Sequence, residues 1–427
     1  MDSTGSSSSV ATSEAAFPAA DVVIGLISYN DAETIATVAG ALCAEIRECF
    51  AGGASRIVLA DAGSKDDSLV RARSAAGACV LLEVPNAQVS GERLEVPYHG
   101  IPGRARLLRA ILIAAQEVRA GVCVAVDARA TAIERSWLQA LVAPIVQDAC
   151  DFVSPYYLRH PHDGTLTKGI VYPVCRALYG VRLRQPAASD FACSPAAIDR
   201  LLEEDIWVSE GARVGIDLWL TTAAISAGFT VGEAVLGVHP HRTRDEGPLD
   251  LATTLTQVVG SLFADIENRV DVWQRVRGSK PVRQVGAPTV TAVADGPGVD
   301  PERLIESYRL GYRELRDIWT WVLPPKTLVE LGRLIAVPPA QFVLDDELWA
   351  RTIYDFALAY RLRVLARDHL LRSLVPLYLG WLASFVQQTR DQTPDAAEQR
   401  VERLCLAFEA QKPYLIARWR WPERLRT

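Results

Sequence analysis

The chain has 427 residues, of which 49% are hydrophobic and 22% are charged, and its formal net charge is −6. This length suits two or three domains, or one large domain with an appendage, and the composition excludes a wholly disordered chain. Because nonspecific nucleic-acid binders usually carry a basic excess, the acidic balance predicts no nucleic-acid partner.

Three features predict a cytoplasmic protein without a membrane span. Residues 1–20 are rich in Ser and Ala and lack the basic and apolar parts of a secretory signal, so we predict a disordered tail. The longest apolar run, 373–386, contains a proline and is shorter than the ~20 residues of a spanning helix, which favours a buried helix. The eight cysteines form no C-x-x-C pair, as expected of buried thiols in a reducing cytosol.

The first part of the chain alternates apolar strands with helices, which predicts an α/β domain with a mainly parallel sheet. Later segments are less regular, a Gly-, Pro- and Val-rich stretch at 278–299 indicates a linker, and the pattern is helical from 301 onward. Strands are predicted at 21–30, 55–60, 78–84, 122–126, 152–157 and 231–238, and helices at 32–50, 104–119, 172–179, 217–227 and 255–276.

Polar residues follow several of the predicted strands. Asn30, Asp61 and Asp127 come directly after strands, and His241 follows a later one. In open α/β sheets, ligands bind at the edge formed by the carboxyl ends of the strands, where these residues would lie. Asp61 can accept hydrogen bonds from a base or ribose, and Asp127 can hold a divalent ion or a sugar hydroxyl. A carboxylate with an imidazole suits ions such as Mn²⁺, so Asp127 and His241 are the candidate metal ligands.

The predicted helix at 104–119 starts with a cation, Arg104, which suits a phosphate at the helix N-terminus. The chain has no P-loop, no glycine-rich dinucleotide turn after the first strand and no G-x-S-x-G motif. Kinase, ATPase and dehydrogenase functions are therefore disfavoured. The residues together describe a site for a nucleoside diphosphate that carries another group.

The order of these motifs resembles the GT-A glycosyltransferases of the family-2 type. The resemblance rests on Ser-Tyr-Asn at 28–30, Asp-Ala-Gly-Ser-x-Asp at 61–66 and an acidic motif at 127–129. Residues 100–104 resemble a G-x-P-G-K loop on the phosphate side, and residues 184–191 resemble a Q-P-x-G-G-[DE] loop on the acceptor side. The Gly-Ile-Asp at 215–217 also fits. This order is similar to that of mannosylglycerate synthase and related transferases, which carry a helical C-terminal domain.

The resemblance implies an α/β, Rossmann-like GT-A nucleotide-diphospho-sugar transferase fold with a helical C-terminal domain. The tail at 1–20 would precede a transferase domain at 21–276, followed by a linker at 277–300 and the helical domain at 301–427. Within the transferase domain, the nucleotide-sugar half would cover about 21–130 and the acceptor half about 131–276.

The implied activity is transfer of a hexose from a nucleoside-diphosphate sugar, of GDP-mannose or UDP-glucose type, to a small polar hydroxyl acceptor such as glycerate. The resemblance leans towards retention of configuration, although both stereochemistries occur on this fold. Asn30 and Asp61 would position the nucleotide, and Arg104, Asp127 and Arg129 the diphosphate.

The acceptor side of the implied site contains Gln185, Ser189 and Asp190. Asp190 and Asp217 are the candidate catalytic residues at the acceptor and the anomeric carbon, where a buried carboxylate can act as a base or stabilise positive charge. For Asp217, capping of the predicted helix at 217–227 is an alternative role.

The chain departs from the family pattern at three motifs, the first of which is the G-x-P-G-K loop, where Arg104 replaces the lysine and keeps its charge. The D-x-D motif reads Asp127-Ala128-Arg129, and the acceptor-side glycines are Ala188 and Ser189. An arginine cannot bind a metal ion but can pair with phosphate oxygens. Either Arg129 replaces the divalent Mn²⁺ or Mg²⁺ ion, or activity is lost.

Two further functions stay open. A catalytically degenerate protein would bind nucleotide sugars as a regulator or scaffold. A nucleotidylyltransferase would share the α/β fold but is disfavoured by the absence of a glycine-rich phosphate loop after the first strand. The sequence leaves open whether the chain forms a homo-oligomer.

Overall fold

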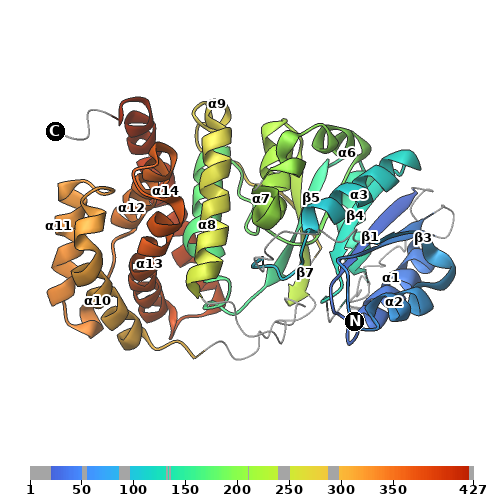
Figure 1. Cartoon of the computed structure of the whole chain (residues 1–427), viewed down its shortest axis with the longest axis horizontal. Coiled ribbons are helices and arrows are strands. Elements are labelled where there is room, and N and C mark those ends of the chain that lie inside the picture. Colours follow the sequence, from blue (N-terminus) through green and yellow to red (C-terminus); the bar gives the residue numbers. More distant parts are fainter. Residues whose placement is uncertain are drawn as a thin grey trace, which may run out of the picture.

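The computed structural model describes residues 21–50, 55–85, 97–130, 133, 136–209, 211–238, 251–286 and 298–422. One half of the molecule contains the sheet with helices on both faces, and the other half is built of helices (Figure 1). The predicted α/β class with a helical C-terminal region is therefore confirmed.

The sheet has eight described strands in the order β3-β2-β1-β4-β6-β5-β7-β8. All neighbouring strands pair in parallel except β6, which runs antiparallel to both β4 and β5. The residue before β6 therefore lies at the same edge as the carboxyl ends of the other strands. The strands are β1 (Val22–Ser28), β2 (Arg56–Asp61), β3 (Val80–Pro85), β4 (Val122–Asp127), β5 (Phe152–Leu158), β6 (Phe191–Cys193), β7 (Val231–Val238) and β8 (Arg283–Val285).

The central strands are apolar on both sides because helices cover both faces of the sheet. Every residue of β1 and β4 is buried. One face packs against α1 and α4, and the other against α3, α6 and α7. On the second face Gly25 permits close approach, since a Cβ there would lie 2.4 Å from Ile111. The helices of this half are α1 (Ile35–Cys49), α2 (Ser68–Ala76), α3 (Arg104–Glu117), α4 (Trp137–Val146), α6 (Pro195–Leu202) and α7 (Gly211–Ser226).

A third hydrophobic core joins the C-terminal helices to α5 and α8, so one core extends across the predicted boundary between residues 276 and 301. Polar contacts strengthen the junction. Arg176 of α5 pairs with Glu402 and Glu409 of α14, and Lys412 Nζ donates to three backbone carbonyls, two of them at the end of α5. The helices of this half are α5 (Tyr172–Tyr179), α8 (Leu251–Asn268), α9 (Val270–Trp273), α10 (Pro301–Trp319), α11 (Pro325–Arg333), α12 (Asp346–Leu362), α13 (Arg367–Thr389) and α14 (Pro394–Arg420).

The predicted buried helix at 373–386 lies within α13. By length and composition α13 is the one helix, among the described residues, that could cross a membrane, and 72% of its apolar window is buried inside the structure. Such burial is typical of a core helix.

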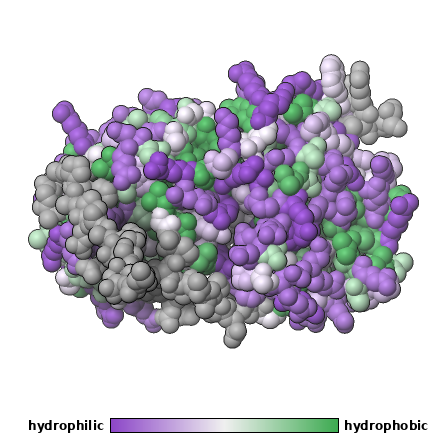
Figure 2. All heavy atoms as spheres, turned by 180° about the vertical axis from the view of Figure 1, so that it is seen from behind, coloured by the Kyte–Doolittle hydropathy of each residue, from purple (hydrophilic) through white to green (hydrophobic). Residues whose placement is uncertain are grey.

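The face of the molecule shown in Figure 2 is largely hydrophilic, with hydrophobic residues in small patches.

Some elements differ from the sequence predictions. The predicted linker contains the edge strand β8, which pairs with β7, and the predicted helix at 255–276 is divided into α8 and α9. Elements α4, β6 and α6 were not predicted. Strand β6 has only three residues, too few to show an alternating pattern, and α4 is apolar on most of its surface and so lacks an amphipathic pattern.

Candidate active site

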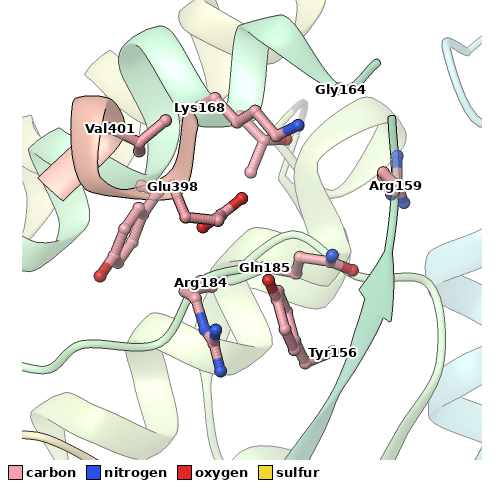
Figure 3. A pocket seen from close by; sticks show the side chains of 10 residues that line it. Tyr156, Arg159, Gly164, Lys168, Arg184, Gln185, Glu398 and Val401 are labelled. Carbon is pink, nitrogen blue, oxygen red and sulfur yellow. The ribbon is translucent and has the colours of Figure 1, made fainter. Parts of the chain in front are cut away.

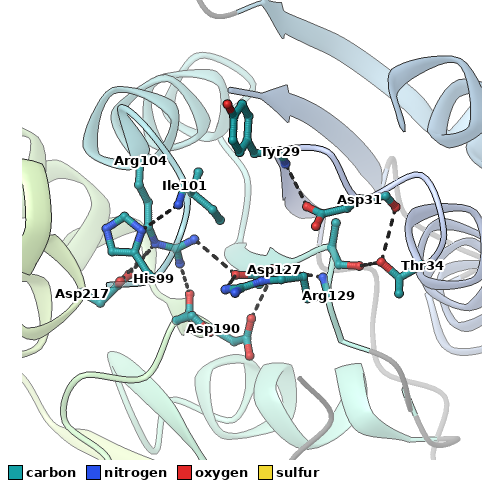
Figure 4. A network of polar contacts seen from close by, with 12 residues as sticks. Tyr29, Asp31, Thr34, His99, Ile101, Arg104, Asp127, Arg129, Asp190 and Asp217 are labelled. Carbon is teal, nitrogen blue, oxygen red and sulfur yellow. Dashed lines mark hydrogen bonds and ion pairs between the residues drawn. The ribbon is translucent and has the colours of Figure 1, made fainter. Parts of the chain in front are cut away.

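A buried cluster of charged side chains lies at the carboxyl edge of the sheet (Figure 4). Asp127 ends β4, and Asp190 directly precedes the antiparallel strand β6, so both reach this edge and both are fully buried. Asp190 accepts a hydrogen bond of 2.8 Å from the backbone N–H of Asp127 at Oδ1 and one of 2.8 Å from the hydroxyl of Tyr157 at Oδ2. Asp190 therefore links the ends of β4 and β5.

Arg129 folds back onto Asp127. Its backbone N–H and Nε donate to Asp127 Oδ1 at 3.0 and 2.9 Å, and Nη2 donates to Oδ2 at 2.6 Å. The Arg129 side chain is 15% exposed and that of Asp127 is fully buried. Burial opposes the charged form of Arg129, but the attraction of Asp127 outweighs it and raises the pKa of Arg129 above its usual value. The pair therefore neutralises Asp127 with a cation from the same turn.

Arg104 points into the protein. It is the first residue of α3, follows Gly103 in the left-handed conformation (φ 64°), and is fully buried. Its Nε lies 3.0 Å from both carboxylate oxygens of Asp217, and its Nη2 donates to the Ser189 carbonyl. Its Nη1 lies 3.9 Å from Asp127 Oδ2 and makes no hydrogen bond with any residue that the structure describes. The residue predicted to face phosphate thus crosslinks α3, α7 and the end of β4.

Asp217 lies on α7, two residues after Gly215, where the helix is kinked (φ −118°, ψ 16°). Its side chain is nearly inaccessible. Burial raises the pKa of Asp217 to about 6, against the opposing attraction of Arg104, and the negative charges of Asp127 and Asp190 add to the increase. The helix is interrupted at Gly215, so Asp217 lies in the first turn of its second segment, close to the predicted start at residue 217.

The predicted nucleotide residues Asn30 and Asp61 hold two turns together. The Asp61 carboxylate accepts four hydrogen bonds of 2.5–2.9 Å, from the Ser28 hydroxyl, the Gly63 N–H and both the N–H and hydroxyl of Ser64. Asn30 has φ 53°, accepts from the Lys65 N–H at 2.8 Å and donates its own N–H to the Ser64 hydroxyl at 2.8 Å. Both residues therefore shape the edge of the site through its backbone.

The predicted acceptor loop is fixed against β5 and α3. The side chain of Gln185 accepts from the backbone N–H of Tyr157 at 3.4 Å and donates to its carbonyl at 2.7 Å. Ser189 contributes its carbonyl oxygen to Arg104. Since Tyr157 also holds Asp190, the structure brings Gln185, Ser189 and Asp190 together at one side of the cluster.

A narrow, partly open cavity with a volume of about 30 Å³ lies next to this loop (Figure 3). Arg159, Lys168 and Glu398 line it and were not singled out from the sequence. Glu398 comes from α14, more than 200 residues after Gln185 in the chain, so no local pattern could have linked the two. The lining also includes Tyr156, Gly164, Thr167, Tyr172, Arg184, Gln185 and Val401.

The described residues do not fit a divalent ion at Asp127, because Arg129 bonds to both of its carboxylate oxygens. No group of three or more His, Cys, Asp and Glu side chains that could hold a metal occurs in the described part of the chain. The other predicted metal ligand, His241, lies outside the described residues.

Comparisons with known proteins give matches only among solved structures; no family model and no curated protein matches the chain. The chain is similar to glucosyl-3-phosphoglycerate synthase from Mycobacterium tuberculosis in complex with Mn²⁺, UDP and glucosyl-3-phosphoglycerate. The sequence identity is 21%, the match covers 59% of this chain and 82% of that chain, and the TM-score is 0.44. The same enzyme with Mg²⁺ and UDP matches at 20% identity, 59% and 81% coverage and a TM-score of 0.43. A mycobacterial protein matches at 20% identity, 66% and 82% coverage and a TM-score of 0.43.

Proposed function

We propose that the chain is a glycosyltransferase that moves a hexose from a nucleoside-diphosphate sugar to a small polar hydroxyl acceptor such as glycerate. The observation that carries this proposal is the charged cluster of Arg104, Asp127, Arg129, Asp190 and Asp217 at the carboxyl edge of the sheet. Ligands of α/β sheets bind at this edge. Burying five ionisable groups is costly, and such groups concentrate at functional sites.

Arg129 is the proposed contact for the donor diphosphate. Its Nε and Nη2 bond to Asp127, so Nη1 lies outside this pair and can donate to a phosphate oxygen in a charge-assisted hydrogen bond. The similar structures hold UDP with Mn²⁺ or Mg²⁺. In this chain the fixed cation of Arg129 would occupy that place, and we propose transfer without a divalent ion at Asp127.

The predicted catalytic roles of Asp190 and Asp217 remain proposals, and their contacts support a positioning role. Asp217 holds Arg104, and Asp190 holds the backbone of Asp127. Both would fix the cations and the end of β4 while the donor binds. Fixed dipoles and charges of this kind stabilise a transition state because they need no reorganisation during the reaction.

The test of donor binding is a thermal-shift panel of UDP- and GDP-sugars, each with EDTA, Mn²⁺ or Mg²⁺. A binding donor raises the melting temperature by mass action. We expect an increase with one class of nucleotide sugar that persists in EDTA. An increase seen only with Mn²⁺ or Mg²⁺ would contradict the role of Arg129, and no increase with any nucleotide sugar would contradict the function.

A catalytically degenerate nucleotide-sugar-binding protein is the alternative. The contacts of Asp190 favour it, because both carboxylate oxygens are bonded within the protein, and Ala188 and Ser189 replace the expected glycines beside it. This alternative predicts donor binding without a glycoside product and without release of free sugar. Mass spectrometry of donor–acceptor mixtures separates the two functions.

A further inference from the structure

The cavity beside Gln185 is linked to the charged cluster through hydrogen bonds of Tyr157. Gln185 lines the cavity and bonds to the backbone of Tyr157, whose hydroxyl donates to Asp190. Helix α14 closes the opposite side with Glu398 and Val401 (Figure 3). The C-terminal helices therefore complete a cavity that begins at the predicted acceptor loop.

Two cations in the cavity lining, Arg159 and Lys168, form no ion pair within the described part of the chain, although Glu398 attracts Lys168 from the same lining. Arg159 makes no hydrogen bond or ion pair with any residue that the structure describes, and its Nε is buried without a partner. Lys168 Nζ donates only to the carbonyl oxygens of His160 and Pro161, at 2.9 and 3.0 Å. Burial lowers the pKa of Arg159 and lowers the pKa of Lys168 to about 8. An anionic ligand would stabilise the charged forms of Arg159 and Lys168, which burial disfavours.

One carboxylate in the lining is also unpaired. Glu398 makes no hydrogen bond or ion pair within the described part of the chain, and burial raises its pKa. Arg184 adds no unpaired cation, because its Nε and Nη2 donate to the buried Glu233 at 3.2 and 3.0 Å. Asp163 attracts both cations from nearby but does not line the cavity, and its Oδ1 accepts from the Gly164 N–H. The unpaired lining groups thus carry one positive charge in excess.

We infer that this cavity binds the acceptor of the proposed transfer and that Glu398 restricts it to small hydroxycarboxylates with a single negative charge. The acceptor carboxylate would pair with Arg159 and Lys168, and Glu398 would accept a hydrogen bond from an acceptor hydroxyl. A phosphorylated acceptor would bring further negative charge towards Glu398 and exceed the charge that the cavity can balance. The inference rests on the proposed function and separates this chain from the similar structures that hold phosphoglycerate.

The test is calorimetric titration of the full chain, saturated with UDP, with glycerate and with 3-phosphoglycerate. We expect the wild-type protein to bind glycerate more tightly. Glu398→Gln keeps the shape of the side chain and should tighten 3-phosphoglycerate binding by roughly tenfold, since it removes one nearby like charge. Asp395→Asn is the matched control, because it removes the same charge from an exposed position one turn earlier on α14.

Three results would overturn the inference: a wild-type preference for 3-phosphoglycerate, an unchanged preference in Glu398→Gln, or no binding of either acceptor. Lys168→Met provides a second variant that should lose affinity for both acceptors. Donor binding is measured on the same samples by thermal shift. A normal donor response without acceptor binding would reject the inference alone, whereas loss of both responses would reject the proposed function as well.

Discussion

The replacement Arg129→Asp restores the D-x-D pattern and should convert the site into a metal-dependent one. In the wild-type protein the Arg129 guanidinium neutralises Asp127 through two hydrogen bonds, and the backbone N–H of Arg129 donates a third. The variant would place two carboxylates two residues apart at the end of β4, without the cation between them. A divalent ion would then balance their charge, since oxygen ligands suit Mg²⁺ and Mn²⁺.

The expected size of the effect follows from burial. Removing one partner of a buried ion pair typically costs about 3–5 kcal/mol, because the other charge stays buried without compensation. Asp127 is fully buried and Arg129 is 15% exposed, so this range applies as an upper bound. The second guanidinium, Arg104, at 3.9 Å, reduces the cost. An ion present at 100 times its dissociation constant would return ~2.7 kcal/mol.

The assay is thermal unfolding of wild type, Arg129→Asp and Arg129→Ala in EDTA and in Mn²⁺. Both variants should melt below wild type in EDTA, and only Arg129→Asp should recover with Mn²⁺. The alanine variant is the control, because it removes the cation without adding a ligand. Our reasoning on Arg129 would be refuted by an Arg129→Asp protein that matches wild type in EDTA or ignores Mn²⁺.

Three other substitutions test separate contacts. Asp217→Asn removes the charge that holds Arg104 and should lower kcat by at least ~100-fold, because that cation would be misplaced. Nucleotide binding should be retained in a thermal-shift assay. A near-normal kcat would refute the role of Asp217. Burial raises the pKa of Glu45 from 4.5 to about 7, so its contribution to stability is present below pH 4.5 and lost as the pH rises through 7. Urea unfolding of Glu45→Gln between pH 4 and 8 should therefore show a weaker pH dependence than wild type, and an equal dependence would count against this assignment. Lys412→Met leaves backbone carbonyls at the end of α5 without their donor and should lower the free energy of unfolding by about 1–3 kcal/mol in the same urea assay. An unchanged midpoint would show that water replaces the lysine.

The strand ends were predictable because β1, β2 and β4 are largely apolar runs separated by helices. Parallel pairing brings the ends of such strands to one edge, so the placement of Asp61 and Asp127 together followed from topology. Asp190 reaches the same edge because β6 runs in the opposite direction, which a three-residue strand cannot reveal in the sequence.

The direction of Arg104 could have been read from the helix pattern. Arg104, Leu107, Leu108 and Ile111 recur at helical spacing and form the buried stripe of α3, so the first residue belongs to the face that packs on the sheet. Its partner Asp217 lies 113 residues later, and no local signal connects the two. Glu398 likewise reaches the cavity through the packing of α14 against α5, which depends on the whole helical core.

The most direct measurement of the proposed function is product analysis with EDTA-treated protein. The protein would be incubated with UDP-glucose or GDP-mannose and glycerate in EDTA, and the mixture analysed by mass spectrometry for the glycosylated acceptor and the released nucleoside diphosphate. We predict that both products form in equal amounts with one donor and that Arg129→Ala forms neither. Donor binding without product would contradict the transferase activity, and product that requires added Mn²⁺ or Mg²⁺ would contradict the role of Arg129.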